Sequence, residues 1–253
     1  MYNTLPLVEV DEAAQSWIKL VQVRSLNNGQ ILLSFEENGS EQPRSGKLLV
    51  KDYNGKIEPI TITLVQEGIS ESIIKEKAAL AAFYEAMGGQ NWKDNTNWLS
   101  DKPLRKWFGV GADDKGHVKY ISFWGNGLKG YLPKEIGDLT ELEELSLSGE
   151  YSSTSGYRPI PEEIGNLKKL KNLTLQGLSF SGTLPASLFG LTELEQLYIN
   201  NPYWMDPQPI PPTIKNLKKL KTLGINYANI TGELPPEIGE LYDLEYLRLN
   251  FNN

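Results

Sequence analysis

The sequence predicts an α+β protein built of several parts: a small N-terminal β-sandwich, a helical cap and a right-handed repeat solenoid. Three observations support this prediction. Short segments of alternating apolar residues fill the chain up to residue 69, one alanine-rich segment follows, and a seven-residue pattern then recurs five times. A fixed repeat period is typical of a solenoid, in which each copy buries its apolar side chains against the next copy.

The recurring pattern reads LTELEEL, LKKLKNL, LTELEQL, LKKLKTL and LYDLEYL. Its first leucines follow one another at steps of 28, 24, 26 and 24 residues, at Leu139, Leu167, Leu191, Leu217 and Leu241. A weaker copy with Val118, Ile121 and Phe123 precedes them, so the solenoid is assigned to residues 117–253. The L-x-L end of each copy is predicted to be a strand, whose leucines point inward and whose intervening residues point outward.

Charges alternate from copy to copy. The successive pairs are Glu141 and Glu143, Lys169 and Lys171, Glu193 and Glu195, Lys219 and Lys221, and Asp243 and Glu245. The copies also alternate in length, so the unit is a double repeat of 50 to 52 residues, and stacking places opposite charges side by side. An exposed ion pair contributes only ~0.2–1 kcal/mol, so this ladder is expected to set register more than stability.

Residues 1–69 are predicted to form an Ig-like β-sandwich. The segments SWIKLVQV, QILLSFEEN, GKLLVKDY and KIEPITITLVQ read as strands, because β-branched and apolar residues alternate in them. Polar turns, NNG, GSEQPRSG and NG, separate the four segments.

Four features of this domain resemble the BACON domain of Bacteroidetes surface proteins. They are Trp17, Asn38, Arg44 and the closing segment Val65-Gln66-Glu67-Gly68. Aromatic residues stand singly in this part of the chain, and a lone aromatic residue on a strand belongs more often to a core than to a sugar site. We therefore interpret the domain as a spacer.

Residues 70–116 are predicted to cap the solenoid. Ser70 or Ser72 is expected to start a helix over SIIKEKAALAAFYEAM. The expected buried stripe of this helix is Ile73, Lys77, Leu80, Tyr84 and Met87. Four aromatic residues follow within 17 residues, namely Trp92, Trp98, Trp107 and Phe108. A sugar site is one interpretation, but the first coil of a solenoid needs an apolar seal, which we favour.

Residues 70–253 resemble plant-type leucine-rich-repeat proteins in the form found in bacteria. The resemblance rests on a W-x-G-V motif at Trp107, Gly109 and Val110, and on copies of L-x-x-L-x-x-L-x-L-x-x-N-x-L-x-G-x-I-P. It implies an inward Asn in each coil that bonds to neighbouring backbone groups. That position holds Asn126 and Asn252, but elsewhere it holds Glu150, Leu178, Pro202 and Ala228. Other groups are therefore expected to satisfy the buried amides there.

The outward strand positions form the candidate binding face, because they carry only two charges among 18 residues. Hydroxyl, amide and aromatic side chains suit a neutral ligand, a glycan or a peptide. The candidate residues are Tyr120, Trp124, Asn172, Thr174, Gln176, Tyr198, Asn200, Asn226, Tyr246 and Arg248. The alternative is that polar residues merely keep an exposed sheet soluble.

The two longer copies offer a second candidate site. Their extra residues lie in GEYSSTSGYRPIP and NNPYWMDPQPIP, and loops on a rigid scaffold often carry binding sites. The candidate residues are Tyr151, Tyr157, Tyr203 and Trp204. Protein–protein adhesion or scaffolding through these loops is the alternative function. In a third interpretation the loops only fill space.

Composition and motifs exclude several functions. The 253-residue chain has a net charge of −7, which disfavours nucleic acid as a partner, and it contains no cysteine. No apolar run is long enough to span a membrane. His117 is the only histidine, Asp113 to Gly116 reads as a turn, and no catalytic motif can be assembled. We expect neither an enzyme nor a metal or cofactor.

The chain stops at Asn253, one strand into a coil, so Leu244, Leu247 and Leu249 are expected on an open apolar end. Solenoids usually avoid such ends. Either the natural protein continues, or two copies pair end to end as a homodimer. The resemblance to surface proteins implies an extracellular or cell-surface location, with a leader or lipid anchor that these residues do not contain.

Overall fold

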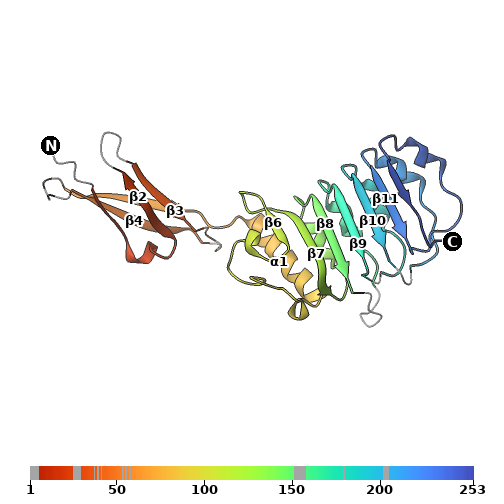
Figure 1. The fold of residues 1–253 in the computed structure, drawn as a ribbon, viewed down its shortest axis with the longest axis horizontal. Helices are drawn as coiled ribbons and strands as arrows, with labels where there is room; N and C mark the ends of the chain where they lie inside the picture. Colours follow the sequence, from red (N-terminus) through yellow and green to blue (C-terminus); the bar gives the residue numbers. More distant parts are fainter. Residues whose placement is uncertain are drawn as a thin grey trace. The chain divides into compact units, whose positions relative to one another are not determined.

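The computed structural model divides into two compact units, residues 1–70 and 71–253, which are described separately (Figure 1). The described residues are 6–24, 30–36, 38, 40, 42–52, 54, 56, 58–150, 158–178, 180–201 and 205–253. The predicted cap and the predicted coils fall in one unit, and they share a core. The boundary between them at residue 116 therefore stays a prediction.

The described part of the first unit holds two antiparallel sheets, one with the strand order β1-β4-β5 and one that pairs β2 with β3. The elements are β1 (Leu7–Val10), the 3-10 turn η1 (Glu12–Ala14), β2 (Ile18–Arg24), β3 (Gln30–Phe35), β4 (Arg44–Lys51) and β5 (Ile60–Gln66). Trp17, Ile18 and Leu48 lie in their common core. An Ig domain has seven or more strands, so the Ig-like class stays a prediction.

The residues that resemble the BACON pattern lie close together. The Arg44 guanidinium stands 4.6 Å from the centre of the Trp17 ring, and its Nε donates a hydrogen bond to Gln66 Oε1 at 2.9 Å. Asn38 is nearly buried, and its amide donates to the Glu67 carbonyl at 3.1 Å. These contacts fasten the loop before β4 to the end of β5.

The second unit begins with helix α1 (Glu71–Ala86), whose buried face overlaps the predicted one. Its buried residues are Ile73, Glu76, Ala79, Leu80 and Phe83. Lys77 and Tyr84 are only partly buried, so the prediction was wrong at two positions of the stripe. Glu76 replaces Lys77 because its carboxylate bonds to the first strand of the solenoid.

The aromatic residues after α1 seal the first coil. Phe83 packs against Trp92, Trp98 and Phe123 with ring centres 5.8, 6.1 and 6.0 Å away. Each of the three indole N–H groups donates to a backbone carbonyl: Trp92 to Met87, Trp98 to Phe108 and Trp107 to Lys102. Because these indoles are at most 8% exposed, they pack as a cap and offer no face to a sugar.

Seven strands of the second unit form one sheet in the order β12-β11-β10-β9-β8-β7-β6, and its strands lie side by side in Figure 1. All neighbours are parallel except β6 and β7. The strands are β6 (Val110–Ala112), β7 (Val118–Leu128), β8 (Glu144–Gly149), β9 (Asn172–Gln176), β10 (Gln196–Asn200), β11 (Thr222–Asn226) and β12 (Tyr246–Arg248).

Short 3-10 turns connect the strands on the other side of the coils. Among the described residues, two lie in the cap and five lie in the coils, each of these five directly after a proline that ends the preceding extended segment. They are η2 (Gly89–Asn91), η3 (Leu104–Lys106), η4 (Lys134–Asp138), η5 (Glu162–Asn166), η6 (Ala186–Gly190), η7 (Pro212–Asn216) and η8 (Pro236–Glu240). Strand leucines such as Leu145, Leu173 and Leu197 are completely buried between sheet and turns. The predicted inward direction of the repeated leucines is confirmed.

Buried amides replace the missing Asn ladder. Asn201 is completely buried, and its side chain both accepts from the Phe180 N–H and donates to the Phe180 carbonyl, each at 2.8 Å. Gln208 accepts from the Leu184 N–H at 2.7 Å. Both groups come from the loop after β10 in the second longer copy, so the expectation that other residues satisfy the buried backbone is confirmed for the coil that holds Leu178.

Candidate binding face

The strand registers place equivalent outward residues in rows across the sheet. The first row is Tyr120, Glu144, Asn172, Gln196, Thr222 and Tyr246. The second row is Ser122, Ser146, Thr174, Tyr198, Gly224 and Arg248. The third row includes Ser148, Gln176, Asn200 and Asn226. The alignment predicted from the repeat steps is confirmed, and most of the candidate residues share one surface.

Exposure separates the candidates into two groups. Trp124 and Tyr246 are 58% and 57% exposed, and Tyr120 is 49% exposed. Thr174 and Asn226 are nearly buried, which corrects their assignment as ligand contacts.

Both of these buried residues bond within the protein. Thr174 Oγ1 accepts from the Gln196 amide at 3.0 Å, and Asn226 Oδ1 accepts from the Asn250 N–H at 2.9 Å. They hold neighbouring side chains and strands in place. The flank-loop candidates Tyr151, Tyr157, Tyr203 and Trp204 lie outside the described residues.

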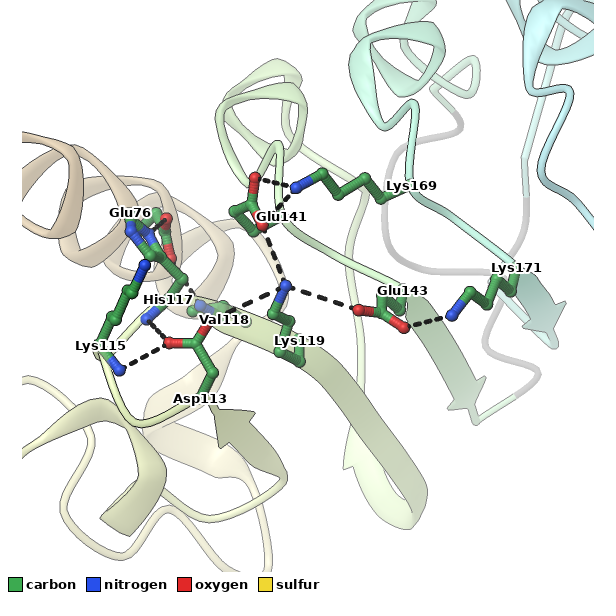
Figure 2. A network of polar contacts seen from close by, with 10 residues as sticks. All are labelled: Glu76, Asp113, Lys115, His117, Val118, Lys119, Glu141, Glu143, Lys169 and Lys171. Atoms are coloured by element: carbon green, nitrogen blue, oxygen red, sulfur yellow. Dashed lines mark hydrogen bonds and ion pairs between the residues drawn. The ribbon is translucent and has the colours of Figure 1, made fainter.

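A network of charges borders the face where the strands begin (Figure 2). Lys119 lies between three carboxylates, with its Nζ 2.9 Å from Glu141, 3.5 Å from Glu143 and 3.8 Å from Asp113. Lys171 continues the network at 2.6 Å from Glu143. The predicted ladder is confirmed by its further pairs, Lys169–Glu141, Lys219–Glu193 and Lys221–Glu195.

The ladder predicts a loss of stability in acid. The hydrogen bond from Lys169, and then the one from Lys119, lower the pKa of Glu141 from 4.5 to about 2. A group whose pKa is lower in the folded state stabilises the protein at pH values above its unfolded-state pKa. This stabilisation is lost as the pH falls through the folded-state pKa. Between pH 4.5 and 2, the urea midpoint should therefore fall more for the wild type than for Glu141→Gln. An equal fall of the urea midpoint in the two proteins would contradict this expectation, and so would a difference between them that 0.5 M salt does not reduce.

The only histidine has a structural contact. His117 Nδ1 lies 2.7 Å from Glu76 Oε1, and the other oxygen of this buried carboxylate accepts from the Val118 N–H at 2.7 Å. Glu76 thus joins helix α1 to strand β7.

An open hollow of about 490 Å³ lies beside this contact. Its lining residues are Asp113, Asp114, Lys115, His117, Glu141 and Lys169. Asp113 Oδ1 accepts from the backbone N–H groups of Lys115 and His117 at 2.9 and 3.0 Å, which confirms the predicted turn. Within the described part of the chain, no group of three or more acidic or histidine side chains is arranged to hold a metal ion.

Comparison with protein families identifies the repeated part. A family model described as a leucine-rich repeat region matches residues 134–253. Residues 134–253 are therefore similar to a leucine-rich repeat region. The strand order and the inward leucines of this leucine-rich repeat region agree with the match, whereas residues 1–133 lie outside it.

Solved plant structures share the fold of the leucine-rich repeat region. A plant ice-binding protein is 29% identical with a TM-score of 0.57, and the match covers 66% of this chain and 53% of that one. The structure of PEPR1–AtPEP1 is 27% identical with a TM-score of 0.57, covering 69% and 24%. The leucine-rich-repeat ectodomain of the receptor kinase SOBIR1 from Arabidopsis thaliana, at 22% identity and a TM-score of 0.52, covers 73% and 94% and supports the fold alone.

These matches cover only part of the related chains. The chain spans about half the length of the ice-binding protein and about a quarter of the PEPR1–AtPEP1 chain. No curated protein sequence matches it. Among the residues that the structure describes, no helix has the length and apolar character of a membrane span.

Proposed function

We propose that this chain is a non-enzymatic binding protein that holds a neutral, extended ligand, a peptide or a glycan, on the outward face of its sheet. The observation that carries the proposal is the row of exposed and half-exposed neutral side chains on registered strands. Tyr120, Trp124 and Tyr246 offer exposed aromatic rings, and Asn172, Gln176 and Asn200 offer amides. Amides both donate and accept hydrogen bonds, and tyrosine adds contact area at a low cost in conformational entropy.

The charge distribution supports a neutral ligand. The charged residues Glu141 and Lys169 lie outside the face, at its border, where they neutralise each other. On the face, the Glu144 carboxylate accepts a hydrogen bond from Ser146 at 3.0 Å.

The decisive experiment probes a glycan array and a peptide library with the wild type and with a Trp124→Ala, Tyr198→Ala double variant. The double variant should lose about tenfold or more in affinity, because each ring supplies a large contact area. Tyr242→Ala is the matched control, since this 86% exposed ring lies in the turn before β12. The proposal fails if no probe binds, or if the double variant binds as the wild type does.

A different result would favour adhesion through the flank loops. Shortening residues 151–157 or 202–204 would then abolish protein binding, while the double variant of the face would bind normally. We also propose that residues 1–69 act as a BACON-like spacer in an exported protein. Labelling of intact source cells with a membrane-impermeant reagent tests the location, and labelling only after lysis would contradict it.

We further propose that this 253-residue chain pairs end to end through its last coil. Leu247 is 43% exposed, whereas the corresponding Leu223 is completely buried, and Phe251 adds apolar surface. Light scattering should show a dimer that Leu247→Lys converts to a monomer, because a buried lysine would lack a partner. A monodisperse wild-type monomer at high concentration contradicts this proposal.

A further inference from the structure

Strand β12 is the edge of the sheet in the second unit. Among the described residues it pairs with β11 alone, where Leu247 lies opposite Leu223. The Tyr246 N–H donates to the Lys221 carbonyl at 3.0 Å and therefore points toward β11. Because successive residues of a strand direct their backbone groups to opposite sides, the N–H and C=O of Leu247 point to the free edge. An edge with free backbone groups can accept a further strand.

The side chains of β12 complement a second copy of the same strand. Tyr246 and Arg248 both lie on the outward face, and Tyr246 is 57% exposed. Within the described part of the chain, the Arg248 guanidinium has no ion pair and no ring contact. If two copies of β12 pair antiparallel about Leu247, residue 246 of each copy stands opposite residue 248 of the other. Each Arg248 then meets a tyrosine ring, which attracts a cation.

The charge ladder selects this arrangement over the other two-fold arrangement of the last coils. Asp243 and Glu245 form the last step of the ladder, and neither makes an ion pair with another described residue. A two-fold axis along the strands would bring these acidic pairs of two copies together, and like charges repel. In the antiparallel arrangement, Glu245 stands opposite Leu249 of the second copy, about 14 Å along the strand from the second Glu245.

We propose that a second copy of this chain adds to β12 edge to edge, with the strands antiparallel and Leu247 at the two-fold axis. Each Leu247 N–H donates to the carbonyl of the other Leu247, and the two side chains continue the apolar core from one copy to the next. The two seven-stranded sheets become one, so that their outward faces join. This inference rests on the proposed end-to-end pairing, because it specifies how the two last coils meet.

Cysteine cross-linking tests the register. The chain contains no cysteine, so a single engineered cysteine reports a single contact. The two Leu247 Cα atoms should lie about 5.5 Å apart, within the range of about 4.4–6.8 Å that a disulfide spans. Under mild oxidation, most of the Leu247→Cys protein should therefore run as a covalent dimer in non-reducing electrophoresis. Leu234→Cys is the matched control, because Leu234 is 48% exposed on the same coil but lies before η8, and it should remain monomeric.

Analytical ultracentrifugation of the full chain tests the paired side chains. Tyr246→Ala and Arg248→Ala each remove both symmetric ring contacts and should raise the dimer dissociation constant about five- to thirtyfold, since one exposed contact contributes about two- to fivefold. The double variant should dissociate about as readily as either single variant, because both substitutions remove the same contacts. Tyr120→Ala, in the same row at the other end of the sheet, should dimerise as the wild type does.

The outcomes separate this arrangement from end-to-end pairing in general. A wild-type dimer overturns the antiparallel register, and leaves the pairing in place, if Leu247→Cys fails to cross-link or if Leu234→Cys cross-links equally well. The same conclusion holds if Arg248→Ala dimerises as tightly as the wild type. A wild-type monomer at high concentration removes both the register and the pairing.

Discussion

Replacing Phe83 by alanine is expected to lower the free energy of unfolding of residues 71–253 by about 3–5 kcal/mol. The ring is completely buried, and it lies between the indoles of Trp92 and Trp98 and the Phe123 ring of the first coil. Its removal leaves a cavity in the contact that joins the cap to the solenoid. Because a first coil without its seal exposes its apolar end, the loss should fall at the upper part of this range.

Urea unfolding followed by far-ultraviolet circular dichroism and by tryptophan fluorescence measures this effect. Phe108→Ala serves as the control, because this ring also touches Phe123, at 5.9 Å, but remains 39% exposed. Its loss should be clearly smaller, about 1 kcal/mol. Equal losses for the two variants would show that the buried ring does not hold the cap in place.

Replacing Asn201 by leucine is expected to cost about 2–5 kcal/mol. Its side chain bonds to both backbone groups of Phe180, which have to remain paired inside the protein. A buried donor or acceptor that loses its partner costs about 1–3 kcal/mol, and here two lose it together. Leucine has the same branched arrangement of four side-chain heavy atoms as asparagine, so the loss reports mainly the missing hydrogen bonds.

The neighbouring Asn200 provides the control for this substitution. Its side chain is half-exposed on the outward face, so Asn200→Leu should change the stability by about 0.5 kcal/mol or less. Thermal unfolding of both variants gives the comparison. A loss of less than about 1 kcal/mol for Asn201→Leu would mean that water reaches the Phe180 backbone in place of the amide.

The sequence predicted the solenoid well because the leucine pattern recurs at nearly constant steps. Each leucine step fixes which residues are neighbours across the sheet, and the registers from Tyr120 to Tyr246 follow the predicted steps. The repeat steps also align Tyr198 with Gly224 on the neighbouring strand. The orientation of the Tyr198 ring could not be predicted from the sequence, because it depends on side-chain packing.

Features that depend on single distant contacts were missed. Asn201 stands one residue before the template position at Pro202, so an alignment by repeat alone passed over it. Burial of Glu76 contradicted the rule that carboxylates stay exposed, because its partner Val118 lies 42 residues further along the chain. In residues 1–69, alternation predicted strands, but strand alternation carries no information about how many strands complete each sheet.

Because Glu and Lys pairs alternate, the charge at the border of a coil depends on whether the coil has an odd or an even place in the array. Deleting residues 167–190 would set Glu193 and Glu195 directly beside Glu141 and Glu143, so that like charges would meet along the border. Deleting 167–216 instead would bring Lys219 and Lys221 to the same place and restore attraction. Shortened or lengthened forms of this protein are therefore expected to tolerate changes by an even number of coils and to resist changes by an odd number.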